Sequence, residues 1–234
     1  MTSAPHRKYG GTADVIAGKL YVAGGWNWPL SGIPTSTLQI YDAASNTWSL
    51  GADMPILSGC SASGAVDGKL YVLTACDGWG GYKNHLHAYD PASNTWTAKA
   101  GSPHSHSTPA AGVIGGKLYV AGGWDDNGRN AYLDAYDPVT NSWSTLASLP
   151  VAVGGSGGAV LDGKLYVMGG SDGSDVSTVY AYDPATNAWS TASPMNVARS
   201  ALVAGVIGDV IYTAGGTGPL STLEGLLATG VLAN

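Results

Sequence analysis

Phenylalanine is absent from this sequence, glutamate occurs once, at Glu224, and only 11% of the residues are charged. Acidic residues outnumber basic ones by 16 to 10, which leaves a net charge of −6. Binding to a phosphate backbone requires a basic stripe, and the basic residues of this chain are scattered. We therefore expect no nucleic-acid partner.

Long apolar runs are absent as well. No segment approaches the roughly 18 consecutive apolar residues that a membrane-spanning helix requires. The first residues, MTSAPHRKYGG, lack the apolar core of a secretory signal. We expect neither a membrane span nor a signal peptide in this chain, and the sequence does not indicate its compartment.

The chain has only two cysteines, Cys60 and Cys76. A hairpin turn at Asp67-Gly68 would bring them near enough for a disulfide. Strict pairing would place residue 60 opposite residue 75, so a disulfide would also need a bulge. Cys76 is taken to replace one glycine of a repeated Gly-Gly pair. A disulfide and two buried thiols are both consistent with the sequence.

Glycine, tyrosine and tryptophan are abundant, at 35, 13 and 8 residues. Glycine inside a helix costs about 1 kcal/mol relative to alanine. Glycine-rich turns and aromatic residues instead suit short strands joined by tight turns. The composition therefore favours an all-β protein.

The sequence repeats itself at intervals of 45 to 50 residues. The nine residues GKLYVAGGW occur twice, and related segments begin at Gly18, Gly68, Gly116, Gly163 and, as GDVIYT, Gly208. An Asn-x-Trp motif follows in the first four repeats and ends at Trp48, Trp96, Trp143 and Trp189. Repeats of this length indicate a solenoid, a propeller or an array.

Each repeat is predicted to form four strands. In the second repeat these are 61–66, 69–74, 85–89 and 95–98, which we call A to D. The A and B strands are joined at Asp67-Gly68, a pair that suits a two-residue hairpin turn. One such sheet cannot bury both of its faces, whereas sheets stacked around an axis can.

The Gly-Gly pair, the tyrosine and the tryptophan at their repeated spacing resemble the kelch repeat, over essentially the whole chain. The resemblance implies an all-β fold, a single β-propeller over residues 1–234 with five four-stranded kelch-type blades. The expected blades are 10–49, 58–98, 107–146, 154–192 and 200–234. The last is degenerate, with Leu232 at the tryptophan position.

Five blades are fewer than the six or seven that kelch propellers mostly have. A complete five-bladed ring would close by side-chain packing and would be a monomer. Alternatively, the chain is a piece of a longer repeat array, natural or engineered, that another copy completes. In that case it would form an oligomer through an open blade edge.

The four Asn-x-Trp tryptophans occupy equivalent positions, so packing between blades explains them. Residues that break the repeat lie in the B–C and D–A loops, which emerge on one face around the mouth of the central channel. The resemblance implies that this is a binding face. The candidate ligand-binding residues are Trp26, Trp28, Trp79, Tyr82, Trp124, Asp125, Arg129, His104 and Arg199.

Several candidates also have structural explanations. Trp26 and Trp124 both follow Gly-Gly and would fold down over the blade edge. Arg199 would form a salt bridge. His104 and His106 could face the same way in an extended segment, but no carboxylate or cysteine at ligand spacing completes a metal site, so solvated histidines are expected. We expect no metal and no cofactor.

No catalytic motif of the G-x-S-x-G, P-loop or H-E-x-x-H kind occurs. The favoured function is a non-catalytic scaffold that captures a protein, peptide or glycan on the channel-mouth face. One alternative, which the resemblance allows, is an enzyme of the sugar-oxidase or epimerase type with its active site at the same mouth. Another is a designed or self-assembling propeller with no ligand.

Overall fold

The computed structural model describes residues 2–27, 32–78, 80–217, 223–227 and 230–231. The candidates Trp28 and Trp79, and Leu232 in the last repeat, lie outside these residues. The described residues contain strands and turns and no helix. The fold is a β-propeller of five four-stranded antiparallel blades, which confirms the predicted fold class.

The strands of each blade follow one another along the chain, from the innermost to the outermost. Blade 1 contains β2 (Thr12–Ile16), β3 (Lys19–Ala23), β5 (Leu38–Asp42) and β6 (Thr47–Leu50). Blade 2 contains β7 (Ala62–Val66), β8 (Lys69–Thr74), β9 (His85–Asp90) and β10 (Thr95–Lys99). Blade 3 contains β11 (Ala110–Ile114), β12 (Lys117–Ala121), β15 (Leu133–Asp137) and β16 (Ser142–Thr145).

Blade 4 contains β17 (Gly157–Leu161), β18 (Lys164–Met168), β19 (Val179–Asp183) and β20 (Ala188–Ala192). Blade 5 contains β21 (Leu202–Ile207), β22 (Val210–Gly215), β23 (Leu223–Leu227) and β24 (Gly230–Val231). Two small sheets lie in the loops: β1 (Lys8–Tyr9) pairs with β4 (Trp26–Asn27), and β13 (Trp124–Asp125) pairs with β14 (Gly128–Arg129).

The turns at one end of the blades follow from their sequences. Asp67 and Gly68 have φ values of 48° and 72°, the left-handed conformation that a tight A–B hairpin requires. At the same end the lysine of each GKLYV segment pairs with the aspartate that ends the third strand of its blade. One example is the 2.7 Å contact between Lys69 Nζ and Asp90 Oδ2. These exposed ion pairs add little stability. The B–C and D–A loops lie at the other end.

Adjacent blades are joined by the tryptophans of the Asn-x-Trp motif. The indole of Trp96 donates a 2.8 Å hydrogen bond to the carbonyl of Ala52 in the loop that precedes blade 2. Trp143 and Trp189 make the equivalent bonds to Ala100 and Ala147. The predicted inter-blade role of these tryptophans is confirmed. In blade 1 the N-terminal segment supplies the acceptor, because Trp48 donates to the carbonyl of Thr2.

The inner strands interlock in the same way at successive junctions. A Cβ atom at Gly64 would lie 2.6 Å from Val113 Cγ2, and one at Gly112 would lie 2.4 Å from Val160 Cγ2. The glycine of one blade therefore makes room for the valine of the next. Buried apolar clusters fill the junctions between blades 1 and 2, 2 and 3, 3 and 4, and 4 and 5.

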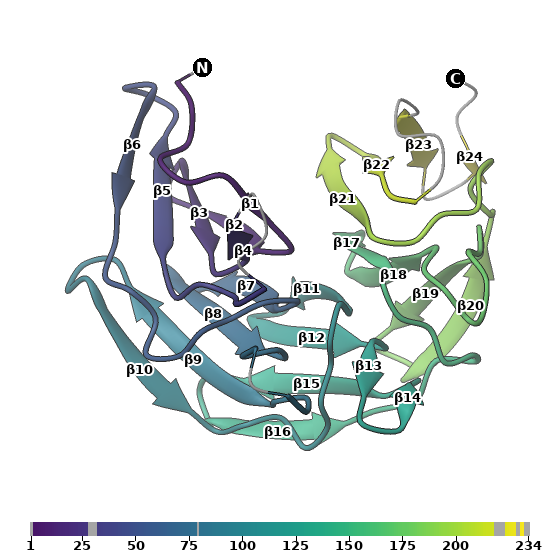
Figure 1. Ribbon diagram of the computed structural model, residues 1–234. Helices are drawn as coiled ribbons and strands as arrows, with labels where there is room; N and C mark the ends of the chain where they lie inside the picture. Colours follow the sequence, from purple (N-terminus) through teal and green to yellow (C-terminus); the bar gives the residue numbers. More distant parts are fainter. Residues whose placement is uncertain (1, 28–31, 79, 218–222, 228–229, 232–234) are drawn as a thin grey trace.

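Blades 1 and 5 lie at the two ends of an arc and are not joined in this way (Figure 1). At the end formed by blade 5, a Cβ atom on Gly205 would meet nothing within 4 Å, and Ile207 is 72% exposed. At the other end, Val15 of blade 1 is 58% exposed. Of the two alternatives left open by the sequence, the ring closed by side-chain packing is therefore not the one that the described residues form (Figure 1). The described residues form an open five-bladed arc.

The last blade is degenerate, as predicted, but its register differs in detail. Val231 lies opposite Leu226, as Trp189 lies opposite Tyr182 in blade 4. Val231, and not Leu232, therefore occupies the tryptophan position. Compared with blade 4, the hairpin of the last blade is shorter by two residues.

The open end can be tested with two equivalent glycines. Gly64→Ala places a methyl group within 3 Å of Val113 and Leu118, so it should destabilise the protein by about 1–3 kcal/mol. Gly205→Ala should leave stability within about 0.5 kcal/mol or raise it slightly, because space is free and the unfolded chain loses entropy. Urea unfolding followed by tryptophan fluorescence measures both. An equal loss in the two variants would contradict the open arc.

Candidate functional site

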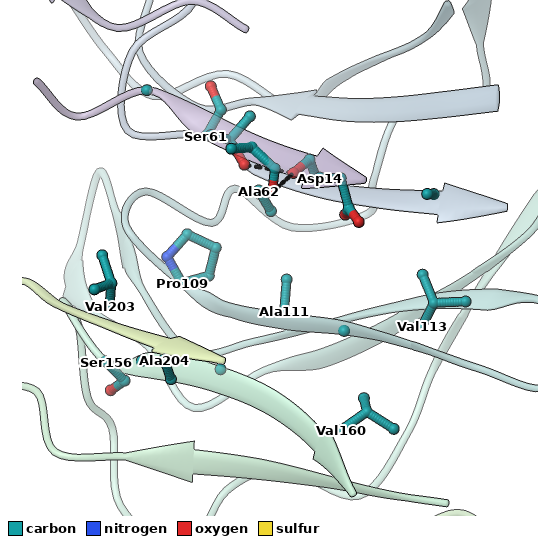
Figure 2. Close-up of a pocket in the computed structure, with 18 of the residues that line it drawn as sticks. Asp14, Ser61, Ala62, Pro109, Ala111, Val113, Ser156, Val160, Val203 and Ala204 are labelled. Carbon is teal, nitrogen blue, oxygen red and sulfur yellow. Dashed lines mark hydrogen bonds between the residues drawn. The ribbon is translucent and has the colours of Figure 1, made fainter. Parts of the chain in front are cut away.

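The five inner strands surround a central cavity of about 540 Å³ (Figure 2). Its lining consists mainly of small side chains such as Ala62, Ala111 and Ala204. Asp14 is the one titratable side chain among the described residues that line it. Burial raises the pKa of Asp14, although hydrogen bonds from the backbone of Val15 and Ala65 oppose that effect. A ligand in the channel would therefore meet mainly small side chains and backbone groups, and few charged groups.

Five equivalent residues surround the channel mouth, and we call them the collar: Gly10, Cys60, Thr108, Gly155 and Ala201. All five have φ between 52° and 72°, although three of them are not glycine. Each left-handed non-glycine residue costs roughly 1–2 kcal/mol. Four backbone hydrogen bonds of 2.8–3.0 Å hold them, each from the amide of one collar residue to the carbonyl of the one before.

The collar encloses a second cavity of about 430 Å³ at the mouth. Tyr9 of blade 1 and Val203 of blade 5 line it from the two sides of the open junction. Tyr9 is 43% exposed and Val203 is 67% exposed. Leu202 and Pro109 add further apolar lining. The mouth is thus an apolar recess on a rigid backbone frame.

Trp26 and Trp124 fold over the edge of the following blade, which was the structural alternative considered for them. A Cβ atom would lie 2.7 Å from Trp26 Nε1 if placed at Gly59, and 2.2 Å from Trp124 Nε1 if placed at Gly154. The other face of Trp26 stacks near Tyr9, with ring centroids 6.4 Å apart. Both indoles are half-buried.

The predicted residues Asp125 and Arg129 lie together on blade 3. They line a recess of about 320 Å³ with Tyr132. The Arg129 guanidinium lies 5.0 Å from the centroid of the Trp124 ring, a cation–π contact. The structure therefore brings Trp124, Asp125 and Arg129 together.

Tyr82 lies on the neighbouring B–C loop of blade 2. Its backbone amide donates a 3.1 Å hydrogen bond to Asp126 Oδ1, which ties the blade 2 loop to the blade 3 loop. Burial is the largest of the effects that raise the pKa of the Tyr82 phenol.

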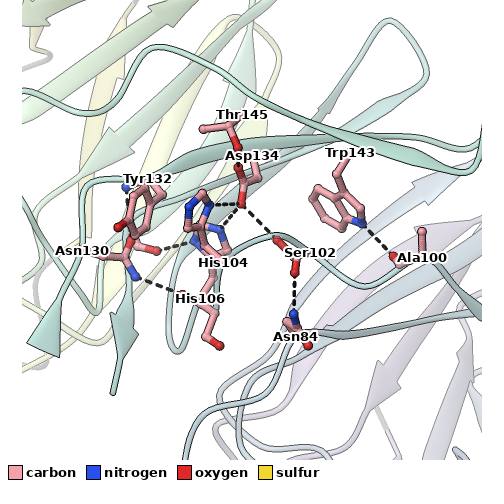
Figure 3. A network of polar contacts seen from close by, with 12 residues as sticks. Asn84, Ala100, Ser102, His104, His106, Asn130, Tyr132, Asp134, Trp143 and Thr145 are labelled. Carbon is pink, nitrogen blue, oxygen red and sulfur yellow. Dashed lines mark hydrogen bonds and ion pairs between the residues drawn. The ribbon is translucent and has the colours of Figure 1, made fainter. Parts of the chain in front are cut away.

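His106 is fully buried and not solvated, contrary to the expectation, whereas the side chain of His104 is 27% exposed. Both contact the carboxylate of Asp134, which comes from β15 (Figure 3). His104 Nδ1 lies 2.9 Å and His106 Nε2 3.1 Å from Asp134 Oδ2. The His104 ring also stacks on Tyr132, with centroids 3.6 Å apart. Sequence spacing missed this carboxylate because it lies on a strand almost 30 residues further along the chain.

The hydrogen bonds of this network surround His106 and lower the pKa of Asp134. His106 is fully buried, and its other ring nitrogen lies 2.7 Å from the carbonyl of Gly122. Both nitrogens of His106 therefore lie within hydrogen-bonding distance of an oxygen, one from Asp134 and one from the carbonyl of Gly122. Burial raises the pKa of Asp134, but hydrogen bonds from His106, Thr145 and His104 outweigh it and hold that pKa below its usual range.

Arg199 is a structural residue and not a surface ligand, which corrects its place among the candidates. Its side chain is completely buried, and its Nη2 lies 2.8 Å from Oε1 of Glu224, the single glutamate. Nη1 donates to the carbonyl of Gly215. Glu224 also accepts bonds from the backbone amides of Asn196 and Val197. The pair anchors the loop between blades 4 and 5.

Cys60 and Cys76 are free thiols in the structure. Cys76 pairs with Gly59, as Trp124 pairs with Ser107 and Ser171 with Gly154. It therefore stands at the position of Trp26 and Trp124, and Thr74-Ala75 replaces the Gly-Gly pair.

Neither a metal site nor a membrane span is found. No group of three or more His, Cys, Asp or Glu side chains is arranged to hold a metal ion within the described ranges. Likewise, no helix in the part of the chain that the structure describes is long and apolar enough to cross a membrane.

Comparison with known proteins agrees with this geometry. The family model of the KLHDC2/KLHL20/DRC7 kelch-repeats domain matches residues 10–216. A putative F-box/kelch-repeat protein from Arabidopsis thaliana is 34% identical over 73 residues, which are 31% of this chain and 29% of that protein. The solved structure of YjhT matches with a TM-score of 0.79 and 20% identity, over 97% of this chain and 82% of that one.

The family match covers most of the chain, so this protein belongs to the kelch-repeat family. The sequence-based recognition is confirmed. The chain spans less than a third of the length of the curated plant relative. The likeness to YjhT supports the propeller fold.

The role of the Asp134 network can be tested by replacing the carboxylate. Asp134→Asn leaves His106 buried without its anionic partner, so we expect a loss of about 3–5 kcal/mol in unfolding free energy at pH 7. The control Asp137→Asn removes the partner of the exposed Lys117 and should leave stability nearly unchanged, because ion pairs at the surface contribute little.

The pH dependence provides a second readout of the same variant. Folding lowers the pKa of Asp134, so its stabilising contribution is complete above the ordinary aspartate pKa of about 4 and is lost as pH falls through the lower folded value. The stability difference between the wild type and Asp134→Asn should shrink in urea titrations below pH ~4. A difference that stays constant with pH would contradict the assigned charges.

Proposed function

We propose that this kelch propeller is a non-catalytic scaffold that captures a protein or peptide segment at the channel mouth. The observation that carries the proposal is the collar cavity, where apolar side chains are exposed around a rigid ring of backbone. Tyr9 and Val203 leave about half or more of their surface open at this cavity. Exposed apolar groups in a concave site are typical of binding surfaces.

The orientation of the aromatic residues favours a peptide over a glycan as the ligand. Stacking on a sugar needs an open aromatic face. One side of Trp124 is covered by Arg129, and Trp26 is packed between Gly59 and Tyr9. An apolar peptide side chain in the mouth cavity needs no such face.

The chemistry of the channel supports binding over catalysis. Acid–base catalysis uses two titratable groups whose pKa values are set apart by their surroundings. Among the described residues of the central cavity only Asp14 titrates, and the mouth lining adds the Cys60 thiol and the Tyr9 phenol. The proposal of a sugar-oxidase or epimerase site therefore has less support.

The proposal is tested by selecting peptides from a random display library on the immobilised chain and measuring their affinities by fluorescence anisotropy at one fixed salt concentration. Tyr9→Ala and Val203→Ser change the mouth. Val139→Ser changes an 88% exposed valine in a C–D turn at the opposite end of the blades and is the control.

We expect each mouth variant to weaken the selected peptides by about tenfold, equivalent to about 1.4 kcal/mol, and the control to leave them unchanged. Thermal melts establish that the variants remain folded. Failure to enrich any peptide, or affinities that respond only to Val139→Ser, would contradict a peptide site at the mouth.

A further inference from the structure

The two cysteines of the chain meet at the edge of the channel mouth. Cys60 belongs to the collar and lines its cavity. Gly59, its chain neighbour, exchanges backbone hydrogen bonds of 2.8 and 3.1 Å with Cys76. These bonds place Cys60 and Cys76 next to each other at the bridge, although residue 60 follows β-bridge partner 59 and does not itself pair across it. Both residues are half-buried, so small molecules can reach them from the mouth.

Polar groups that can donate hydrogen bonds lie beside the two thiols. The indole of Trp26 and the hydroxyl of Ser107 contact Cys60. Ser107 Oγ also lies 3.3 Å from Cys76 Sγ. In blade 3 the equivalent positions hold Thr108 and Trp124. The thiol pair is therefore present in blade 2 and absent from blade 3. Packing of the propeller does not require cysteine at either position.

The surroundings shift the pKa values of the two thiols in opposite directions. Hydrogen bonding to Cys76 is the largest influence on Cys60 and, with the bonds from Trp26 and Ser107, outweighs burial and lowers the pKa of Cys60 to about 6. The same hydrogen bond, together with burial, raises the pKa of Cys76. Other titratable groups nearby are Tyr82, Asp77 and Lys83, of which Lys83 pairs with Asp77 at 3.6 Å. The lowered pKa favours the thiolate form of Cys60 at neutral pH, and the raised pKa favours the protonated form of Cys76.

We propose that Cys60 and Cys76 form a peroxide-reactive dithiol site at the channel mouth, with Cys60 as the attacking sulfur and Cys76 as the resolving thiol. The thiolate is the nucleophilic form of cysteine, and sensor cysteines are accessible and lie beside a resolving cysteine. Cys60 lines the same cavity as the proposed peptide site, but the proposed dithiol does not rest on peptide binding.

The chemistry balances with hydrogen peroxide as the oxidant. Cys60 Sγ attacks one peroxide oxygen, the O–O bond breaks, and the hydroxide that leaves takes a proton to become water, so that Cys60 becomes a sulfenic acid. Cys76 Sγ then attacks Cys60 Sγ, and the S–O bond breaks as the S–S bond forms. The departing hydroxide takes the Cys76 proton as a second water. Two thiols are oxidised, one peroxide is reduced, and an added dithiol reverses the change.

The first test adds one equivalent of hydrogen peroxide to the reduced full chain at pH 5.5 and follows intact mass and free thiols. The wild type should lose two hydrogens and both thiols within one molecule. Cys76→Ser should stop at a sulfenic acid on residue 60 that dimedone traps. Cys60→Ser should react slowly. Mixed sulfenic acids on both cysteines, or disulfides only between molecules, would overturn the proposal.

A matched control separates this site from any exposed cysteine. Thr108→Cys in a background that carries Cys60→Ser and Cys76→Ser places a single thiol at the equivalent collar position, with a left-handed φ of 52°. At pH 5.5 the wild-type Cys60 should react with peroxide on the order of tenfold faster than this control, because its larger thiolate fraction outweighs its lower intrinsic nucleophilicity. Equal rates would contradict the assignment.

The second readout is the pH profile of Cys60 alkylation by iodoacetamide. The midpoint should lie near pH 6 in the wild type and move upward in Cys76→Ala, which loses the main hydrogen-bond donor. Trp26→Phe should move it by a smaller amount. Circular dichroism establishes that each variant is folded. A wild-type midpoint near the ordinary cysteine value of about 8.5 would overturn the role of Cys60.

Discussion

The fold depends on the contact between neighbouring blades, because a single four-stranded sheet cannot bury both of its faces. The same parts recur at each junction: an indole such as that of Trp96 bonded to the preceding loop, a glycine such as Gly64 that admits a valine of the next blade, and a buried apolar cluster. Stability therefore accumulates junction by junction, as in other repeat proteins. Blades 1 and 5 each pack against one neighbouring blade. Their opposite faces keep exposed apolar residues, among them Val15 and Ile207.

The candidate site is a consequence of the same repetition. Equivalent residues meet around the axis, so a left-handed position repeated in every blade becomes a collar held by successive backbone bonds. The residues beside the collar differ from blade to blade. Blade 2 places two thiols there, blade 3 places a histidine–aspartate network further out, and the opening between blades 1 and 5 exposes Tyr9 and Val203. Function is carried by departures from the repeat on a frame that the repeat constructs.

Much of the fold could be predicted from the sequence, because the repeat motifs mark strands and turns locally. The strands of blade 2 agree with their predicted bounds to within one residue. Ring closure could not be predicted, because it depends on how far each junction rotates. The Asp134 partner of His104 and His106, and the Glu224 partner of Arg199, lie 25 to 30 residues away and meet only in three dimensions. The exchange of Gly-Gly for Thr74-Ala75 was misread, although counting from Gly68 as from Gly18 already places Cys76 at the position of Trp26.

The most direct measurement of the open junction is disulfide trapping at equivalent sites in a chain whose own cysteines are replaced by serine. Gly64→Cys with Val113→Cys spans the junction between blades 2 and 3, where a Cβ atom at residue 64 would lie 2.6 Å from Val113 Cγ2. Val15→Cys with Gly205→Cys places thiols at the same strand positions of blades 1 and 5. The open arc predicts that oxidation links the first pair within one molecule and leaves the second pair unlinked, since a disulfide needs Cα atoms within about 7 Å. Efficient intramolecular linking of the second pair would contradict it and show that blades 1 and 5 meet.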